Sequence, residues 1–455
     1  MPDLATTWLE TEIVDDAQSL AVQPPAPKSE LDFVRLLSAK LPPIKTTGPD
    51  WFAYQSGLWQ PVSSATFLPA ALEIFHENDR TIRKAKTLIE HIEASSQIPD
   101  GSLIGFTRFD ADSVLINAAN GIVRITPTTI NLEPHNQTHN FSRQCAASYC
   151  PEQTAPLFNR VLGETLPDPD DLALFQLCAG NFLYPDARYE TALVCYGEAG
   201  RGKSTVADPI ASALGTSLVS RLSMTQICDP KSYSLPNLRL SAVNLGTELT
   251  TADISESGNF KTVVSGEPVD ARPIYGAPFV MRTACKLWFL SNSLPRFKHG
   301  TDAELRRTRF LRFDFKPVKN DVTLKGKLAT ETNAVFNFML RGLQQLLSSP
   351  AIPLGGPASQ AVHDRFQISN DPVGSFVSAK CHLDPDARVS TDTLRSAFDD
   401  FISEHGLPEI CGVWFSRALY ERFTTIKQVR IQRNNERCYM IAGLRLLPEP
   451  FDEIE

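Results

Sequence analysis

The segment CYGEAGRGKSTV, at residues 195–206, constrains the fold of this chain more than any other stretch. It fits the pattern G-x-x-x-x-G-K-[ST], with an apolar, strand-like stretch before it and a helix-like stretch after it. Glycine permits the backbone dihedral angles that let several N–H groups point toward one phosphate. The sequence therefore predicts a phosphate-binding loop between a strand and a helix. The alternative is a glycine turn that only connects those two elements.

A nucleotide bound in this loop gives individual side chains a role. Lys203 would bridge the β- and γ-phosphates of ATP, and the Ser204 hydroxyl would bind Mg²⁺. ATP and Mg²⁺ are thus the expected cofactors. The residues expected to contact the nucleotide are Gly197, Gly200, Gly202, Lys203, Ser204 and Thr205.

Strand and helix patterns alternate over residues 189–316, which is typical of a parallel sheet with helices on its faces. The amphipathic stretch AVFNFMLRGLQQLLSS predicts a helix that closes this region. The fold class is therefore α/β, with a P-loop ATPase domain expected over residues 156–349. Four apolar stretches are expected to be its strands: ETALVCYG, LRLSAVNLGTEL, ACKLWFLSN and RFLRFDF.

The rest of the chain divides into four further parts. Residues 1–29 are proline-rich without periodicity and predict a flexible tail. Residues 30–155 mix helix and strand patterns and predict an α+β domain, in which apolar spacing predicts one long helix over residues 67–96. Proline and glycine predict a linker at 350–361, followed by a last domain at 362–455.

Hydrolysis of ATP needs a group that orients water and positive charge near the γ-phosphate. Glu248 lies at the carboxyl end of the second expected strand and Asn292 at the carboxyl end of the third, at the sheet edge where ligands bind. Arg306 and Arg307 precede the fourth strand. Each residue also has an ordinary alternative. Glu248 can cap a helix, Asn292 can begin a turn, and the arginines can form a solvated basic edge.

Composition and charge exclude several classes of protein. A net charge of -8 argues against a protein whose whole surface binds nucleic acid. No run of about 18 apolar residues exists that could span a bilayer. The first residues are acidic and lack the apolar stretch of a secretory signal, and the nine cysteines are scattered, as is typical of reduced, buried thiols. We therefore expect a cytoplasmic protein with no membrane partner.

The order of these motifs resembles the superfamily 3 helicases, specifically the phage, plasmid and poxvirus-type primase-helicase group. The resemblance covers about residues 60–447 and implies an AAA+-type ATPase core. Such proteins assemble into rings, usually hexamers, with the nucleotide between subunits and single-stranded DNA in the central channel. The stretches that carry the resemblance are NGIVRI, LFQLCAGNFLYPDARYETALVCYGEAGRGKSTV, NFKTVVSGEPVDARPIYGAPFVMRTACKLWFLSNSLP, ELRRTRFLRFDF, AVFNFMLRGLQQLL and CYMIAGLRL.

The resemblance assigns roles to the residues around the nucleotide. It implies that Glu248 activates water and that Asn292 is the sensor. It also implies that Arg306 and Arg307 reach the γ-phosphate of the neighbouring subunit, so that activity requires an oligomer. One feature departs from the group's pattern, because Glu248 is the sole carboxylate of the second motif. Mg²⁺ binding would then rest mostly on Ser204 and water, and hydrolysis could be slow.

The resemblance also implies a hairpin that faces the channel and grips the DNA backbone. Lys261, Gly266 and Arg272 fall in the corresponding motif. The group commonly places lysines beside the hairpin tyrosine, whereas this chain reads ARPIYGAPF. DNA contact at the tip would therefore fall to Arg272, Tyr275 and Arg282.

The end of the chain is locally basic. Residues 409–447 carry seven basic and three acidic side chains, which leaves a local net charge of +4. Their pattern of helix, strand, Asn-Asn turn and strand is the outline of a winged helix and predicts a DNA-binding domain. Arg430, Arg433 and Arg437 flank the expected turn and would contact phosphates. The alternative is the solvated face of a small packing domain.

Two further constellations carry weaker signals. Asp110 and Asp112 resemble the paired carboxylates of primase sites, but the same spacing also opens an ordinary turn. A second set has the spacing H-x₃-H-x₅-C-x₄-C, which could bind zinc although neither half has C-x₂-C spacing. The alternative for this set is a loop-rich connection. Its members are His135, His139, Cys145 and Cys150.

Together these features predict an ATP-dependent replicative DNA helicase of a phage, plasmid or other mobile element, which translocates on single-stranded DNA as a ring. The expected partners are single-stranded and forked DNA, other copies of the chain in a homo-hexamer, and a separate primase, because no primase domain is evident. The alternative is a nucleotide-gated replication initiator or assembly factor with weak or no unwinding. A small-molecule kinase is disfavoured, since it would leave the basic C-terminal domain without a role.

Overall fold

The computed structural model describes residues 29–247, 254–297, 302–316, 321–433 and 436–448. The chain divides into two compact units. The first extends to Arg124 and includes Asn131–Cys145, and the second contains Ile125–Ile130 and the residues from Ala146 onward. Within the described ranges, no helix is long and apolar enough to cross a membrane.

The first unit combines helices with two small sheets, of strand order β1-β2-β3 and β4-β5-β6-β7. Its helices pack around a core that includes Leu37, Trp51 and Ile92. This is the expected α+β architecture. Its elements are α1 (Glu30–Lys40), β1 (Ile44–Thr47), β2 (Asp50–Gln55), β3 (Leu58–Val62), α2 (Leu68–Glu73), α3 (Ile82–Ser95), β4 (Thr107–Asp110), β5 (Ser113–Ala118), β6 (Gly121–Ile125) and β7 (Ile130–Glu133).

The single helix expected over residues 67–96 is wrong, because the structure has two helices there, α2 and α3. Helix α2 ends at Glu73, and α3 begins only after Thr81, whose side chain accepts a hydrogen bond from the backbone N–H of Lys84. Thr81 is therefore an N-cap that starts a new helix. The apolar spacing suggested one helix because Ala71 of α2 and Leu88 of α3 are buried in the same core.

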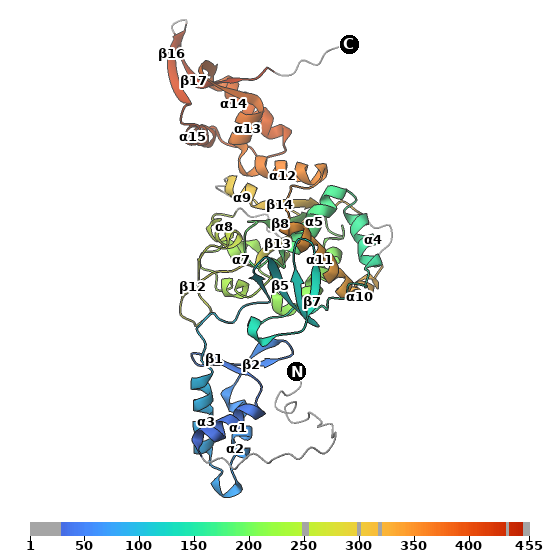
Figure 1. The fold of residues 1–455 in the computed structure, drawn as a ribbon. Helices are drawn as coiled ribbons and strands as arrows, with labels where there is room; N and C mark the ends of the chain where they lie inside the picture. The colour runs from blue at the N-terminus through green and yellow to red at the C-terminus, as the bar shows by residue number, and fades with distance from the viewer. Residues whose placement is uncertain (1–28, 248–253, 298–301, 317–320, 434–435, 449–455) are drawn as a thin grey trace. The chain divides into compact units, whose positions relative to one another are not determined.

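The second unit is built on a five-stranded sheet of order β14-β8-β13-β10-β9, in which every neighbouring pair is parallel. Figure 1 shows β8, β13 and β14 side by side in this sheet. The four strands expected from the sequence are confirmed, and a two-residue fifth strand was not predicted. The strands are β8 (Ala192–Tyr196), β9 (Val219–Ser220), β10 (Val243–Thr247), β13 (Lys286–Ser291) and β14 (Thr308–Arg312).

Helices pack around this sheet, and a small two-stranded hairpin, β11 and β12, follows α8. The closing helix predicted from its amphipathic pattern is α11, which is buried along most of its length. The elements are α4 (Pro156–Thr165), α5 (Pro169–Asn181), α6 (Lys203–Leu214), α7 (Met224–Cys228), α8 (Gly258–Ser265), β11 (Val269–Ala271), β12 (Phe279–Met281), α9 (Asp302–Arg306), α10 (Leu324–Ala329), α11 (Thr332–Leu347) and α12 (Pro357–Asn370).

Helices α5 and α11 approach each other through a glycine on each side. A Cβ atom on Gly342 would lie 2.1 Å from the carbonyl oxygen of Gln176 on α5. A Cβ atom on Gly180 would lie 2.2 Å from the backbone of Gly342. Neither distance is compatible with a side chain, so the absence of side chains sets the spacing of the two helices.

The C-terminal part of the second unit has its own apolar core, which includes Phe376, Phe398 and Phe415. Its antiparallel sheet has the order β15-β17-β16. The expected helix, strand and strand at the end of the chain are confirmed as α15, β16 and β17, whereas strand β15 was not predicted. The elements are α13 (Pro372–Lys380), β15 (Cys381–Ser390), α14 (Thr391–Glu404), α15 (Gly412–Arg422), β16 (Lys427–Arg433) and β17 (Glu436–Leu446).

The expected linker at 350–361 overlaps helix α12, which begins at Pro357. Proline is well tolerated in the first turn of a helix, so its presence did not exclude one here. Val362 and Phe366 of α12 lie in the core of the parallel sheet, and the Phe366 ring is 4.9 Å from that of Phe310 on β14. The expected boundary at 361 therefore falls inside a helix that packs against the sheet.

The glycine contact between α5 and α11 can be tested with Gly342→Ala, which we expect to destabilise the second unit by about 3 kcal/mol through overpacking. The matched control is Gly163→Ala on α4, where a Cβ atom meets nothing within 4 Å. That control should be neutral or gain up to about 1 kcal/mol from helix propensity. Thermal unfolding followed by circular dichroism measures both, and equal midpoints would contradict the close approach.

Candidate functional site

A cavity of about 830 Å³ opens at the carboxyl edge of the parallel sheet. Residues 199–205, which follow β8, line it together with Thr247 at the end of β10 and Asn292 just after β13. Helix α4 contributes Arg160 and Glu164 on another side. The sequence prediction that these strand ends meet is therefore confirmed. In open parallel sheets this edge is where ligands bind.

The loop of residues 197–202, here called the glycine loop, is held by close contacts at both ends. A Cβ atom on Gly197 would lie 2.1 Å from the carbonyl oxygen of Phe313, just past β14. Gly202 packs against the methyl group of Thr165 at the end of α4, and its φ of +87° strongly favours glycine. The loop conformation therefore depends on glycine at these positions.

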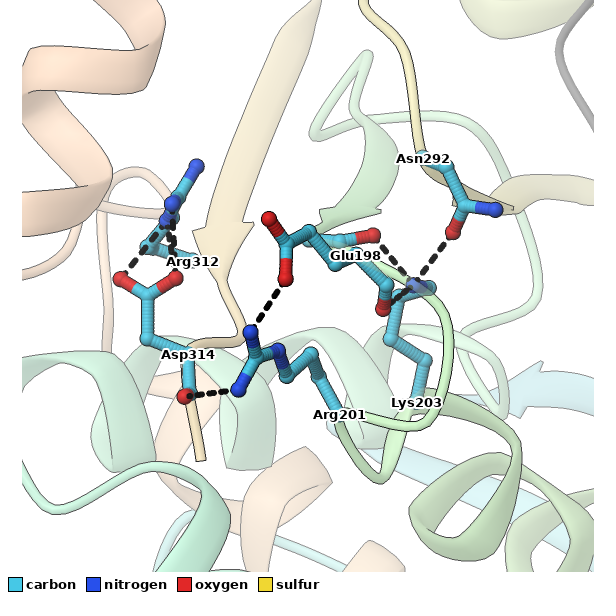
Figure 2. Close-up of polar contacts among 7 residues, drawn as sticks. Glu198, Arg201, Lys203, Asn292, Arg312 and Asp314 are labelled. Carbon is cyan, nitrogen blue, oxygen red and sulfur yellow. Dashed lines mark hydrogen bonds and ion pairs between the residues drawn. The ribbon is translucent and has the colours of Figure 1, made fainter. Parts of the chain in front are cut away.

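Lys203 begins α6, and its ammonium group is buried beside the glycine loop. Its Nζ donates hydrogen bonds to the carbonyl oxygens of Gly197 and Glu198, the second at 2.8 Å. It also donates to Oδ1 of Asn292 at 2.8 Å, as Figure 2 shows. Burial lowers the pKa of the Lys203 ammonium. The structure thus brings together two predicted site residues that are far apart in the sequence.

A charged rim beside the loop was not identified from the sequence. Arg201 forms an ion pair with Glu198 and donates to the backbone carbonyl of Asp314 (Figure 2). The Asp314 carboxylate in turn pairs with Arg312 at 2.7 Å, and the Arg312 guanidinium lies 5.0 Å from the centre of the Tyr196 ring. The Glu-x-x-Arg spacing within the loop is the signal that could have indicated the first of these pairs.

The remaining predicted residues of the loop lie at its exit into α6. Ser204 is exposed and Thr205 is half-buried, and both line the cavity. Gly200 has a φ of +75°. Glu248 lies outside the described residues, so its position stays a prediction. Asn244 of β10 is buried and forms hydrogen bonds to both backbone groups of Leu222, so its amide side chain is already engaged.

The two arginines before β14 differ in their environments. Arg306 is exposed. Arg307 is buried, and its guanidinium donates to Ser265 Oγ at 2.8 Å and pairs with Glu190 at 3.0 Å within the same chain. A role in a neighbouring subunit stays a prediction for both, but Arg307 in this conformation is engaged inside its own subunit.

The residues expected to contact DNA occupy two places in the second unit. Tyr275, at the tip of the β11–β12 hairpin, is fully exposed with a φ of +61°, and Arg272 beside it is exposed. Lys261 lies on α8, where it forms an ion pair with the buried Glu304 at 3.2 Å. Arg430 is exposed on β16, directly opposite Tyr439 of β17.

Two of the arginines expected near the turn, Arg433 and Arg437, have side chains outside the described residues. Their backbones belong to β16 and β17, on either side of residues 434–435, which lie outside the described residues. Arg282 is exposed just after β12.

The two weaker constellations do not assemble into sites. Asp110 lies in an ordinary antiparallel hairpin formed by β4 and β5. Its carboxylate pairs with Arg124 at 2.6 Å, and this contact lowers the pKa of Asp110. Cys145 is fully buried, which raises the pKa of its thiol. In the part of the chain that the structure describes, no group of three or more His, Cys, Asp and Glu side chains is arranged to hold a metal ion.

The tight contact at the start of the glycine loop predicts the effect of Gly197→Ala. We expect it to cost about 3 kcal/mol, because the added methyl group overlaps the Phe313 carbonyl. Gly200→Ala meets no atom within 4 Å. It should cost only about 1 kcal/mol, from its left-handed backbone. Urea unfolding compares the two variants, and a cost for Gly197→Ala no larger than that for Gly200→Ala would contradict the contact.

Comparisons with known proteins give two partial family matches. Residues 35–167 match a family described as D5 N terminal like. Residues 195–307, which include the glycine loop and both arginines, match a family of unknown function, DUF5906. Each match spans less than half of the chain. A search of curated proteins found no match.

Solved structures are similar over most of the chain. The A-form apo structure of the NrS-1 C-terminal region has a TM-score of 0.54 at 12% identity, and the similarity covers 92% of this chain and 100% of that one. A further A-form apo structure, of NrS-1 residues 305–718, has a TM-score of 0.51 at 11% identity with the same coverage. At these identities the similarity shows a shared fold.

Proposed function

We propose that this chain is an ATP-dependent DNA helicase that acts in replication as a ring of identical subunits. The observation that carries the proposal is the position of Lys203. Its ammonium group lies beside the glycine loop and Asn292, and Lys203 lines a cavity of about 830 Å³ on the carboxyl edge of a parallel sheet. An ammonium group and an amide at this edge can bind a γ-phosphate and orient a water molecule next to it.

The residues around the cavity fit ATP and Mg²⁺. The oxygens that now accept from the Lys203 ammonium are neutral, so they can be exchanged for phosphate oxygens, which bind a cation more strongly. The N-terminus of α6 adds backbone N–H groups for the phosphates, and the exposed hydroxyl of Ser204 would bind Mg²⁺. Bound ATP would supply the energy for movement along DNA.

Glu248 would orient the attacking water, and Arg306 would reach the γ-phosphate of the neighbouring subunit. Arg306 is the better of the two arginines for that role because it is exposed, whereas Arg307 has partners in its own subunit. The nucleotide would then lie between subunits, and a ring such as a hexamer would be needed for activity.

A second candidate is a nucleotide-gated replication initiator that forms rings but unwinds little. Two observations favour it. At the tip of the β11–β12 hairpin, the exposed Tyr275 is flanked by Ile274 and Gly276, whereas the resembled group commonly has lysines beside this tyrosine. In the second motif, the Asn244 amide is engaged with Leu222, so it is not available to bind Mg²⁺.

The helicase proposal predicts that two inactive variants restore each other. Lys203→Ala and Arg306→Ala should each abolish ATP-driven strand displacement on a forked duplex. In an equal mixture, about a quarter of the interfaces would combine an intact Lys203 with an intact Arg306. ATP hydrolysis should therefore return to about a quarter of the wild-type rate.

Wild-type protein mixed with Lys203→Ala serves as the control for subunit exchange. A mixture of the two variants that stays inactive would contradict the intersubunit site. Wild-type rings that bind DNA and nucleotide without unwinding would favour the initiator instead.

The C-terminal domain would bind duplex DNA as a winged helix, with β16 and β17 as the wing. Arg430→Ala should weaken duplex binding and reduce the slope of log K against log salt by about 1, because one phosphate contact is lost. The control is Lys380→Ala at the end of α13, directly before β15 of the same sheet, where Lys380 pairs with Glu404. Fluorescence anisotropy across a salt series measures both, and equal slopes would contradict a wing contact.

A further inference from the structure

Helices α8 and α9 are joined by a buried carboxylate. Glu304 of α9 has only 1% of its surface exposed. Its Oε1 accepts a hydrogen bond from the Ser257 hydroxyl, just before α8, and forms an ion pair with the Lys261 ammonium at 3.2 Å. A buried charge is costly unless it is paired and hydrogen-bonded, so this carboxylate requires α8 to stay in place.

A second polar contact joins the other end of α8 to the same region. The Ser265 hydroxyl, at the end of α8, accepts from the Arg307 guanidinium at 2.8 Å and donates to Glu190 at 3.1 Å. Arg307 directly follows the last residue of α9. Helix α8 is therefore attached to the α9 segment at both of its ends.

Helix α8 leads to the hairpin proposed to contact DNA, and helix α9 leads to the arginine proposed to contact the neighbouring subunit's nucleotide. Helix α8 ends at Ser265, four residues before β11, the first strand of the hairpin with Tyr275 at its tip. Helix α9 ends at the exposed Arg306. A displacement of the hairpin base is therefore transmitted through Glu304 to the arginine proposed to contact the neighbour's nucleotide.

We propose that Glu304 is a positioning residue that couples the hairpin to Arg306, so that DNA bound at the hairpin accelerates ATP hydrolysis. This inference rests on the proposed function. It also gives Lys261 a role inside the protein, because its ammonium group neutralises Glu304. The coupling is carried by the ion pair, and therefore both partners are needed for it.

The experiment measures ATP hydrolysis by the full chain against increasing single-stranded DNA. In Glu304→Gln, the isosteric amide still accepts from Ser257 but no longer pairs with Lys261. We expect stimulation by DNA to fall about tenfold, as for loss of a typical coupling energy. The rate without DNA and the KM for ATP should stay within about twofold of the wild type, as expected when only coupling is lost. A merely structural role would lower the rate without DNA as well.

The matched control is Glu267→Gln, which removes the same charge from an exposed position just after α8. It should be stimulated by DNA as the wild type is. If Glu304→Gln does not fold, Ser257→Ala tests the same link more gently, and stimulation should fall about threefold, as for the loss of one ordinary hydrogen bond. Equal stimulation of the folded variant and the Glu267→Gln control would overturn the proposal.

The binding of single-stranded DNA by Glu304→Gln distinguishes two roles for Lys261. If Lys261 instead gripped DNA, Glu304→Gln would release its ammonium group and strengthen binding of single-stranded DNA. We expect no such gain, and we expect Lys261→Met combined with Glu304→Gln to lose no more stimulation than either change alone. Tighter DNA binding by Glu304→Gln, or additive losses in the double variant, would refute the coupling.

Failure of this inference can be told from failure of the proposed function. A wild-type protein that hydrolyses ATP faster with DNA, together with an equally stimulated Glu304→Gln variant, would overturn the coupling and leave the helicase proposal intact. A wild-type protein that hydrolyses no ATP would overturn both.

Discussion

The burial of the Lys203 ammonium group is the constraint on which the site depends. A charged group with little access to water must have acceptors on several sides, and here these are two carbonyl oxygens of the glycine loop and the amide oxygen of Asn292. They come from the end of β8 and the end of β13. The ammonium group therefore holds two neighbouring strand ends in register, and it keeps the loop closed around the position where a phosphate would bind.

Close backbone contacts join the glycine loop to the neighbouring elements of the fold. Gly197 touches the carbonyl after β14, and Gly202 touches Thr165 at the end of α4. The same device recurs where α5 and α11 meet through Gly180 and Gly342. In each place the missing side chain lets two backbones approach, so the cavity is shaped by packing as much as by polar contacts.

The polar links between α8 and α9 connect the end of α9 at Arg306 to the base of the β11–β12 hairpin, which we propose contacts DNA. Glu304 lies beside α8 in a buried position, whereas the neighbouring Arg306 is exposed. A buried pair next to an exposed arginine is suited to passing a displacement from one surface to another, because packed elements shift together rather than deform. The proposed helicase needs such a connection, since ATP hydrolysis drives movement only when the two sites sense each other.

The glycine loop, the four apolar strands and the presence of Lys203 and Asn292 at one sheet edge could be predicted from the sequence, because a strand–loop–helix pattern fixes which residues reach one edge of a parallel sheet. The sequence did not determine the break between α2 and α3 or the packing of α12, since apolar spacing does not record which core a side chain enters. Only the tertiary structure decided the partners of Glu304, Arg307 and Lys261. These charges interact across long separations in the chain, and a charge that looks solvated in a sequence becomes an internal ion pair only when folding removes its water.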